Sequence, residues 1–234
     1  RADAKRRVAV EEAAKDEVRK SDGGLRGVTD DVPQVVRRQP LAETYIGLVE
    51  TGVGLIPAGT GTAALARMAA ERAADLPNDH FSFFRTALEN TALAKVSTSA
   101  AEAFDLGLLQ PGDLVTADPD RQWADAARQA RALAEAGYRP PAERPIPVLG
   151  RRGVAAADSL TYNQLAGHRL SEHDRTVVME LARVMAGGDV AEGTALAEGY
   201  LLDLEREAFL RLLGMPLTRD RIRHTLTTGK PLRN

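Results

Sequence analysis

The chain has 234 residues, of which 44% are hydrophobic and 27% charged, a composition ordinary for a globular protein of one large or two small domains. Its formal net charge of -2 gives no support for nucleic-acid binding, and the absence of cysteine excludes disulfides and thiolate chemistry. No apolar run reaches the ~18 residues of a membrane span. We therefore expect a cytoplasmic protein without a membrane span or a nucleic-acid partner.

Only 4% of the residues are aromatic, so Ala, Leu and Val must supply most of the core, which predicts closely packed helices. The start of the chain is charged and has no apolar stretch that would suit a secretory signal. It does not begin with Met, which fits a processed, trimmed or partial chain.

The first forty residues form a zone of their own. Residues 2–20 are dense in Lys, Arg, Glu and Asp, and they predict a charged helix with little apolar surface to bury. Asp22-Gly23-Gly24 ends this helix. Residues 31–40 contain two prolines and predict an extended linker. We therefore divide the chain into a charged N-terminal segment with its linker, residues 1–40, and a second region, residues 41–234.

The second region begins with a short apolar run of β-prone residues, 44–49, and continues with helices. Ser171 and Asp174 fit a capping box at the start of one of them. The predicted elements are, in chain order, a strand over 44–49, a glycine-rich turn over 52–61, helices over 62–75, 79–93 and 99–106, a brief strand over 114–116, a helix over 119–136, an extended connection over 138–152, helices from 154 onward and over 177–186 and 191–213, and a last helix that Thr218 caps and that runs to about 227.

The stretch from Glu43 to Thr62 is the most informative for chemistry. It contains a predicted strand, a carboxylate at Glu50, and a loop with Gly54, Pro57 and Gly59 that leads into a helix. Glycines allow the backbone to approach a ligand closely. An acid at the end of a strand beside such a loop is suited to general acid–base work next to a bound substrate.

This stretch resembles the crotonase (enoyl-CoA hydratase/isomerase) family, in which an acid is followed by a loop of the type Gly-x-Ile/Leu-Pro-x-Gly-Gly-Gly/Thr. The chain is most similar to the hydratase domain at the C-terminal end of fused bacterial 3-hydroxyacyl-CoA dehydrogenases. The resemblance covers about residue 41 to the end. The segments that carry it further are 100–109, 170–189 and 204–234.

The resemblance implies an α/β fold, the C-terminal part of a crotonase-like (ClpP/crotonase) fold that is mainly helical in the portion present. It implies a component of fatty-acid β-oxidation that acts on acyl-CoA thioesters, with no cofactor beyond this substrate. Glu50 stands where the second of two catalytic glutamates of hydratases lies, and Gly54, Pro57, Gly59 and Lys230 are the implied substrate-binding residues. Members associate as trimers or hexamers, so we expect a homo-oligomer or a partner chain.

The sequence also departs from the family pattern. Upstream of Glu43 it has no Gly-Gly-Gly-Cys-Glu segment, which carries the first catalytic glutamate, and no Ala-Gly-Ala/Gly-Asp segment, which carries an oxyanion donor. Thr60 stands where a glycine is more common. Two hypotheses follow: an enzyme component whose missing parts come from another chain or have been lost from this one, or a non-catalytic remnant that serves as an oligomerisation or binding module.

Competing interpretations of single residues remain. Glu50 is also explained as a solvated residue at a strand end, and Lys230 as part of an exposed basic tail. Residues 59–64 superficially resemble a dinucleotide-binding loop, but Ile-Pro-Ala rather than a strand precedes them. His168 and His173 are spaced poorly for two metal ligands on one helical face, so we expect surface and capping roles and no metal site. No serine-hydrolase motif and no nicotinamide-binding domain is recognisable.

Overall fold

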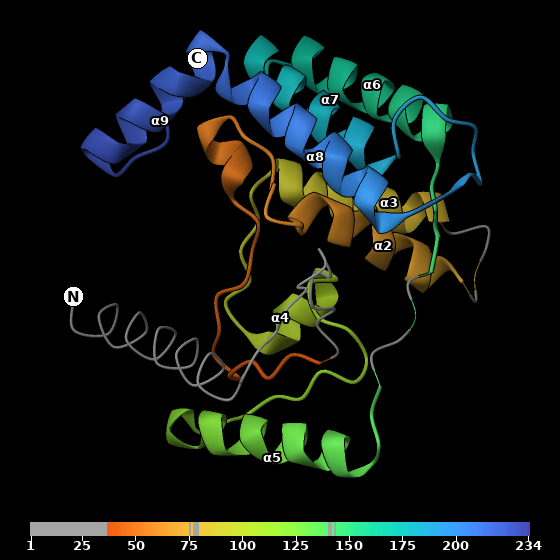
Figure 1. Cartoon of the computed structure of the whole chain (residues 1–234). Coiled ribbons are helices and arrows are strands. Elements are labelled where there is room, and N and C mark those ends of the chain that lie inside the picture. Colours follow the sequence, from red (N-terminus) through yellow and green to blue (C-terminus); the bar gives the residue numbers. More distant parts are fainter. Residues whose placement is uncertain (1–36, 75, 77–79, 140–141, 143) are drawn as a thin grey trace, which may run out of the picture. The chain divides into compact units, whose positions relative to one another are not determined.

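Figure 1 shows the computed structural model of the chain, which describes residues 37–74, 76, 80–139, 142 and 144–234. The chain divides into two units, Arg1–Val36 and Arg37–Asn234. The charged helix and most of the linker predicted for residues 1–40 lie outside the described residues, as does residue 79, where the second helix of the second region is predicted to begin. All of the described residues belong to the second unit, Arg37–Asn234.

The main helical body of this unit confirms the prediction of packed helices. In it α6 packs on α7, α2 on α3, and α7 on α8, while α7 also contacts α2 and α3 (Figure 1). The helices are α2 (Gly61–Ala73), α3 (His80–Ala92), α6 (Gly150–Ala166), α7 (Glu172–Met185) and α8 (Glu198–Leu213). The last helix, α9 (Pro216–Thr228), contacts α8 and a 3-10 turn, η1 (Glu50–Val53).

The core between these helices is built from small and branched aliphatic side chains, as the low aromatic content predicts. Phe84 of α3 is the one aromatic side chain in it that is fully buried within the described residues. Small side chains allow helices to approach closely, so the many alanines set the close packing. The alanines of this core are Ala63, Ala66, Ala69, Ala70, Ala157, Ala182, Ala186 and Ala208.

A second set of elements lies between α3 and α6 in the sequence. It comprises α4 (Ala100–Asp105), η3 (Pro119–Arg121) and α5 (Gln122–Glu135). Ser99 caps α4 by accepting the N–H of Glu102 at 3.1 Å, and a small core of Ala100, Ala103 and Leu109 supports it. Residues 38–42 run parallel to 114–116 and meet at the bridge of Leu41 with Thr116. Helix α5 has no buried residue.

The β structure of the described chain is sparse. Strands β1 (Ile146–Pro147) and β2 (Ala195–Leu196) pair antiparallel, and Gly47 forms an isolated bridge with Val96. The prediction of a strand over 44–49 is therefore wrong, because a single bridge does not make a ladder. None of the helices in the described part combines the length and the apolar character needed to cross a membrane.

Two predicted helix starts are also wrong. The helix expected from residue 191 begins only at Glu198, because residues 195–196 pair with β1 instead. Thr218 does not cap α9, which begins at Pro216, and its hydroxyl is buried and bonded elsewhere. By contrast, the predicted capping box is confirmed: the side chains of Ser171 and Asp174 each accept the other's backbone N–H, at 3.1 and 3.0 Å.

Candidate functional site

Glu50 begins the tight turn η1 rather than ending a strand. The carbonyl oxygen of Glu50 accepts the N–H of Leu55, and that of Thr51 accepts the N–H of Gly54, both at 3.0 Å. Gly54 closes the turn with φ of 82°, a left-handed conformation that favours glycine. The turn therefore sets the direction in which the Glu50 side chain leaves the backbone.

The carboxylate of Glu50 has an unusual environment. The residue is half-buried, and its Oε2 atom is buried without a hydrogen-bond partner among the described residues. A buried carboxylate oxygen without a partner is costly, and such atoms are rare in folded proteins. This oxygen is thus an acceptor for a donor that the described residues do not supply, which disfavours the interpretation of Glu50 as a solvated strand end.

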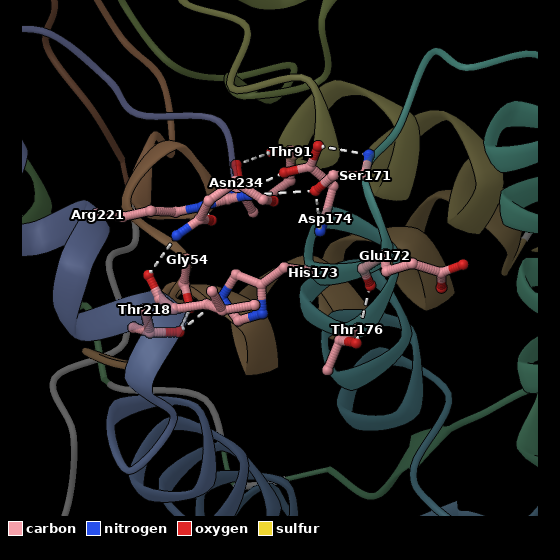
Figure 2. Close-up of polar contacts among 12 residues, drawn as sticks. Gly54, Thr91, Ser171, Glu172, His173, Asp174, Thr176, Thr218, Arg221 and Asn234 are labelled. Atoms are coloured by element: carbon pink, nitrogen blue, oxygen red, sulfur yellow. Dashed lines mark hydrogen bonds and ion pairs between the residues drawn. The ribbon is translucent and has the colours of Figure 1, made fainter.

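Buried hydrogen bonds hold the turn on two sides (Figure 2). On one side the hydroxyl of Thr51 donates to the carbonyl of Thr91 in α3 at 2.9 Å. On the other side the hydroxyl of Thr218 in α9 donates to the carbonyl of Gly54 at 3.0 Å. Nε2 of His173 lies 2.9 Å from the same Thr218 oxygen.

His173 was expected to have a surface or capping role, and this prediction is wrong. Its side chain is buried in the first turn of α7, a helix that contacts η1, and it reaches Thr218 of α9. Burial lowers the pKa of His173, the positive charge of Arg221 lowers it further, and Asp174 opposes both. The imidazole is therefore neutral at neutral pH. His168, in contrast, is exposed as expected.

Arg221 of α9 is the centre of a second group of polar contacts beside the turn (Figure 2). It is 1% exposed. Its guanidinium donates to Asp174 at 2.7 Å, to the Ser171 hydroxyl at 3.3 Å and to the side chain of Asn234 at 2.8 Å. Burial raises the pKa of Asp174, but hydrogen bonds from Ser171 and Arg221 lower it more, so the pKa is below its ordinary value.

The glycine-rich loop is closed by a residue that the sequence did not indicate. Glu205 of α8 is buried, and its carboxylate accepts the N–H groups of Thr60 at 2.7 Å and Ala63 at 2.9 Å. Burial raises the pKa of Glu205, and its backbone partners partly oppose this. Free N–H groups at a helix start are what bind phosphates. Because Glu205 occupies these N–H groups, the loop is a poor dinucleotide site.

The sequence contains a pattern that indicates the burial of Glu205. It lies on the face of α8 that also carries Leu201, Ala208 and Leu212, all buried. An acid at a helical spacing within an apolar face is rarely buried unless it has partners. This pattern predicts that Glu205 is buried and has partners, but it does not identify Thr60 and Ala63 as these partners.

The other predicted site residues lie in different surroundings. Pro57 is buried, and its carbonyl accepts both the N–H and the hydroxyl of Thr62, at 3.0 and 2.7 Å. Gly59 is exposed at the tip of the loop, and Lys230 is exposed after α9. Glu50 and Gly54 thus lie in one turn, whereas Gly59 and Lys230 lie at exposed positions of other segments. Substrate binding by Gly54, Pro57, Gly59 and Lys230 stays a prediction.

A pocket of about 220 Å³ adjoins the turn. Its lining includes Thr51 and Gly52 of η1, Asp174 and Val177 of α7, and Leu232 beyond α9. Typical ligand pockets measure roughly 300–1,000 Å³, so this one suits a single group of a ligand. Within the described ranges, no three His, Asp or Glu side chains gather as a metal site would require.

Comparisons with known proteins identify one curated protein that is similar to the chain. No family model matches it. It is 41% identical over 214 residues to the "Probable 3-hydroxyacyl-CoA dehydrogenase" of Bacillus subtilis (strain 168), an alignment that covers 90% of this chain and 26% of that protein. The chain therefore spans about a quarter of the length of the relative. The similarity concerns one region of that protein, so the share of its activity that this region carries is a separate question.

Proposed function

We propose that the chain is a component of fatty-acid β-oxidation that acts on acyl-CoA thioesters. Its relative is a probable 3-hydroxyacyl-CoA dehydrogenase, and the loop from Glu50 to Thr62 is similar to that of enoyl-CoA hydratases and isomerases. In this proposal Glu50 is one acid–base residue of a hydratase- or isomerase-type site. The acyl-CoA thioester is the substrate, no further cofactor takes part, and the site lies in a cytoplasmic oligomer.

The observation that carries the proposal is the Glu50 carboxylate. Its Oε2 atom is buried and has no hydrogen-bond partner among the described residues. A carboxylate in this state can accept a proton from a water molecule or from a carbon next to a thioester carbonyl. Glu50 belongs to a tight turn that Gly54 closes, and its neighbours Thr51 and Gly52 line a small pocket.

One part of the chemistry must come from elsewhere in this proposal. The enolate that forms during hydration needs backbone N–H donors, each worth roughly 2.7–4 kcal/mol in comparable sites. The N–H groups of Thr60 and Ala63 are bonded to Glu205, so they are not these donors. We assign the oxyanion donors and the first catalytic glutamate to another part of the assembled protein.

Hydration of crotonyl-CoA by the assembled protein, followed at the ultraviolet band of the thioester, tests the proposal. Glu50→Gln keeps the size of the side chain and removes the base, so we expect a loss of kcat of roughly 10²–10⁴-fold. Glu43→Gln, at an exposed position of the same segment, is the matched control and should keep parental activity. An active parent whose Glu50→Gln variant is equally active would rule out the assigned role.

A second candidate function is a non-catalytic binding or oligomerisation module. Large apolar side chains next to the turn favour it: Tyr45 is 78% exposed, Val49 48% and Val96 40%. Gly47, which lies between Tyr45 and Val49, forms a bridge with Val96, so these side chains belong to one neighbourhood. A folded oligomer without any hydratase activity, which Tyr45→Asp converts to monomers in sedimentation velocity, would favour this candidate.

A further inference from the structure

The hydroxyl of Thr218 has two polar neighbours, and counting protons assigns the direction of both hydrogen bonds. A hydroxyl carries one proton, and a carbonyl oxygen can only accept. The Thr218 proton therefore goes to the Gly54 carbonyl at 3.0 Å. It follows that Nε2 of His173 carries a proton and donates it to Thr218 Oγ at 2.9 Å.

The two bonds form a directed chain from His173 through Thr218 to the Gly54 carbonyl. Thr218 is 0% exposed and His173 4% exposed, so water does not compete for these groups. Bonds in such a chain polarise one another, and a buried group that loses its partner is costly. The chain therefore has one favoured arrangement rather than several.

Close packing around Gly54 makes this arrangement specific. A Cβ atom at Gly54 would lie 3.0 Å from Thr218 Oγ, 3.2 Å from His173 Nε2 and 3.3 Å from Arg221 Cδ. The left-handed φ of 82° also disfavours any other residue. Glycine at this position lets the two side chains approach the backbone of the turn directly.

The Gly54 carbonyl lies at the end of the turn that begins at Glu50. The N–H of Gly54 and the N–H of Leu55 bond back to the carbonyls of Thr51 and Glu50. Any rotation of the Gly54 peptide therefore shifts these bonds and, with them, the direction of the Glu50 side chain. An acid–base residue misplaced by about 1 Å can lose roughly 10²-fold in rate.

We propose that His173 and Thr218 are positioning residues for Glu50, which they orient through the Gly54 carbonyl. The inference rests on the proposed function in giving Glu50 an acid–base role. Neither side chain needs to touch the substrate, because both act from behind the turn.

Hydrogen exchange of the Leu55 amide tests the inference without requiring turnover. Thr218→Val keeps the shape of the side chain and removes the hydroxyl, so we expect Leu55 to exchange at least ~10-fold faster, as local opening predicts. His173→Leu should have the same effect. Thr218→Ser, which keeps the hydroxyl, should restore slow exchange, and Thr227→Val, at an exposed position of α9, should change nothing.

Hydrogen exchange of the buried Leu181 amide in α7 distinguishes a local effect on the turn from a general loss of stability. If Leu55 and Leu181 accelerate by the same factor, the two residues only stabilise the fold and the inference is overturned. If Thr218→Val does not fold, His173→Gln takes its place in the comparison. The side-chain amide of Gln can still donate a hydrogen bond, so the Leu55 amide should exchange at a rate between those of the parent and of His173→Leu.

The hydratase assay adds a second readout. Thr218→Val should lower kcat and leave KM nearly unchanged, whereas a rise in KM alone would overturn the inference. An assembled parent protein without hydratase activity would count against the proposed function only, because the exchange of Leu55 still decides whether the chain of hydrogen bonds positions the turn.

Discussion

Glu205 accepts the N–H of Thr60 at 2.7 Å, although 145 positions separate the two residues in the sequence. Thr60 has φ of 75°, an uncommon conformation for a residue with a Cβ atom. The bond from Glu205 helps to hold this conformation at the start of α2. The loop after Glu50 is thus stabilised by α8, far along the chain, rather than by its glycines alone.

Replacing Glu205 with Ala should destabilise the fold. The change leaves the N–H groups of half-buried Thr60 and buried Ala63 without their acceptor, and a buried group in this state costs about 1–3 kcal/mol. We expect the free energy of unfolding in urea to fall by about 2–4 kcal/mol. Glu207→Ala, at an exposed position of the same helix, is the control. Equal stability of both variants would show that Glu205 contributes nothing.

Replacing Arg221 with Met should also destabilise the protein strongly. Met removes the charge from a side chain that is 1% exposed and leaves Asp174 without its ion-pair partner. Breaking such a pair typically costs about 3–5 kcal/mol. Arg223 forms an exposed pair with Asp220, so Arg223→Met should cost at most about 1 kcal/mol. Thermal unfolding of the two variants beside the parent checks this difference.

Gly54 and Gly199 should respond to alanine with opposite signs. Gly54→Ala forces a side chain into a left-handed conformation and against Thr218, so a loss of about 1–3 kcal/mol is expected. Gly199 lies in α8, and nothing lies within 4 Å of the position that a Cβ atom would take there, so Gly199→Ala should stabilise by about 0.4–1 kcal/mol. Denaturant midpoints measure both. A stabilising Gly54→Ala would contradict the close packing around that glycine.

His173 should make the stability of the protein dependent on pH in the mildly acidic range. Its pKa is lowered below 6.5 by burial and by Arg221, against the opposing effect of Asp174. The unfolded state therefore binds the proton first, so the contribution of His173 is present above about pH 6.5 and is lost as the pH falls through the folded pKa. Urea unfolding of the parent and of His173→Gln should diverge in this window. Parallel curves would show that His173 is not protected from protonation.

Several features of the structure could be predicted because they depend on neighbours in the sequence. The Ser171–Asp174 capping box and the termination of α8 before Pro216 follow from local hydrogen bonding and backbone sterics. Most of the length of α2, α3 and α7 follows from the helical spacing of apolar residues, and the Ala-rich core follows from the composition. The turn-forming character of the loop after Glu50 was also visible in the sequence.

Only the tertiary structure decided the surroundings of these residues. Residues 44–49 are β-prone, but the described chain offers them a single bridge, so Glu50 begins a turn instead of ending a strand. His173 and Arg221 look like ordinary surface residues of amphipathic helices, yet both are buried, and the apolar face that carries Glu205 does not identify the partners of that residue. Their partners lie far away in the sequence. In the chain of hydrogen bonds, 45 positions separate His173 from Thr218, and 164 positions separate Thr218 from Gly54. Sequence spacing predicts contacts along one helix, whereas contacts between distant segments arise only when the helices pack together.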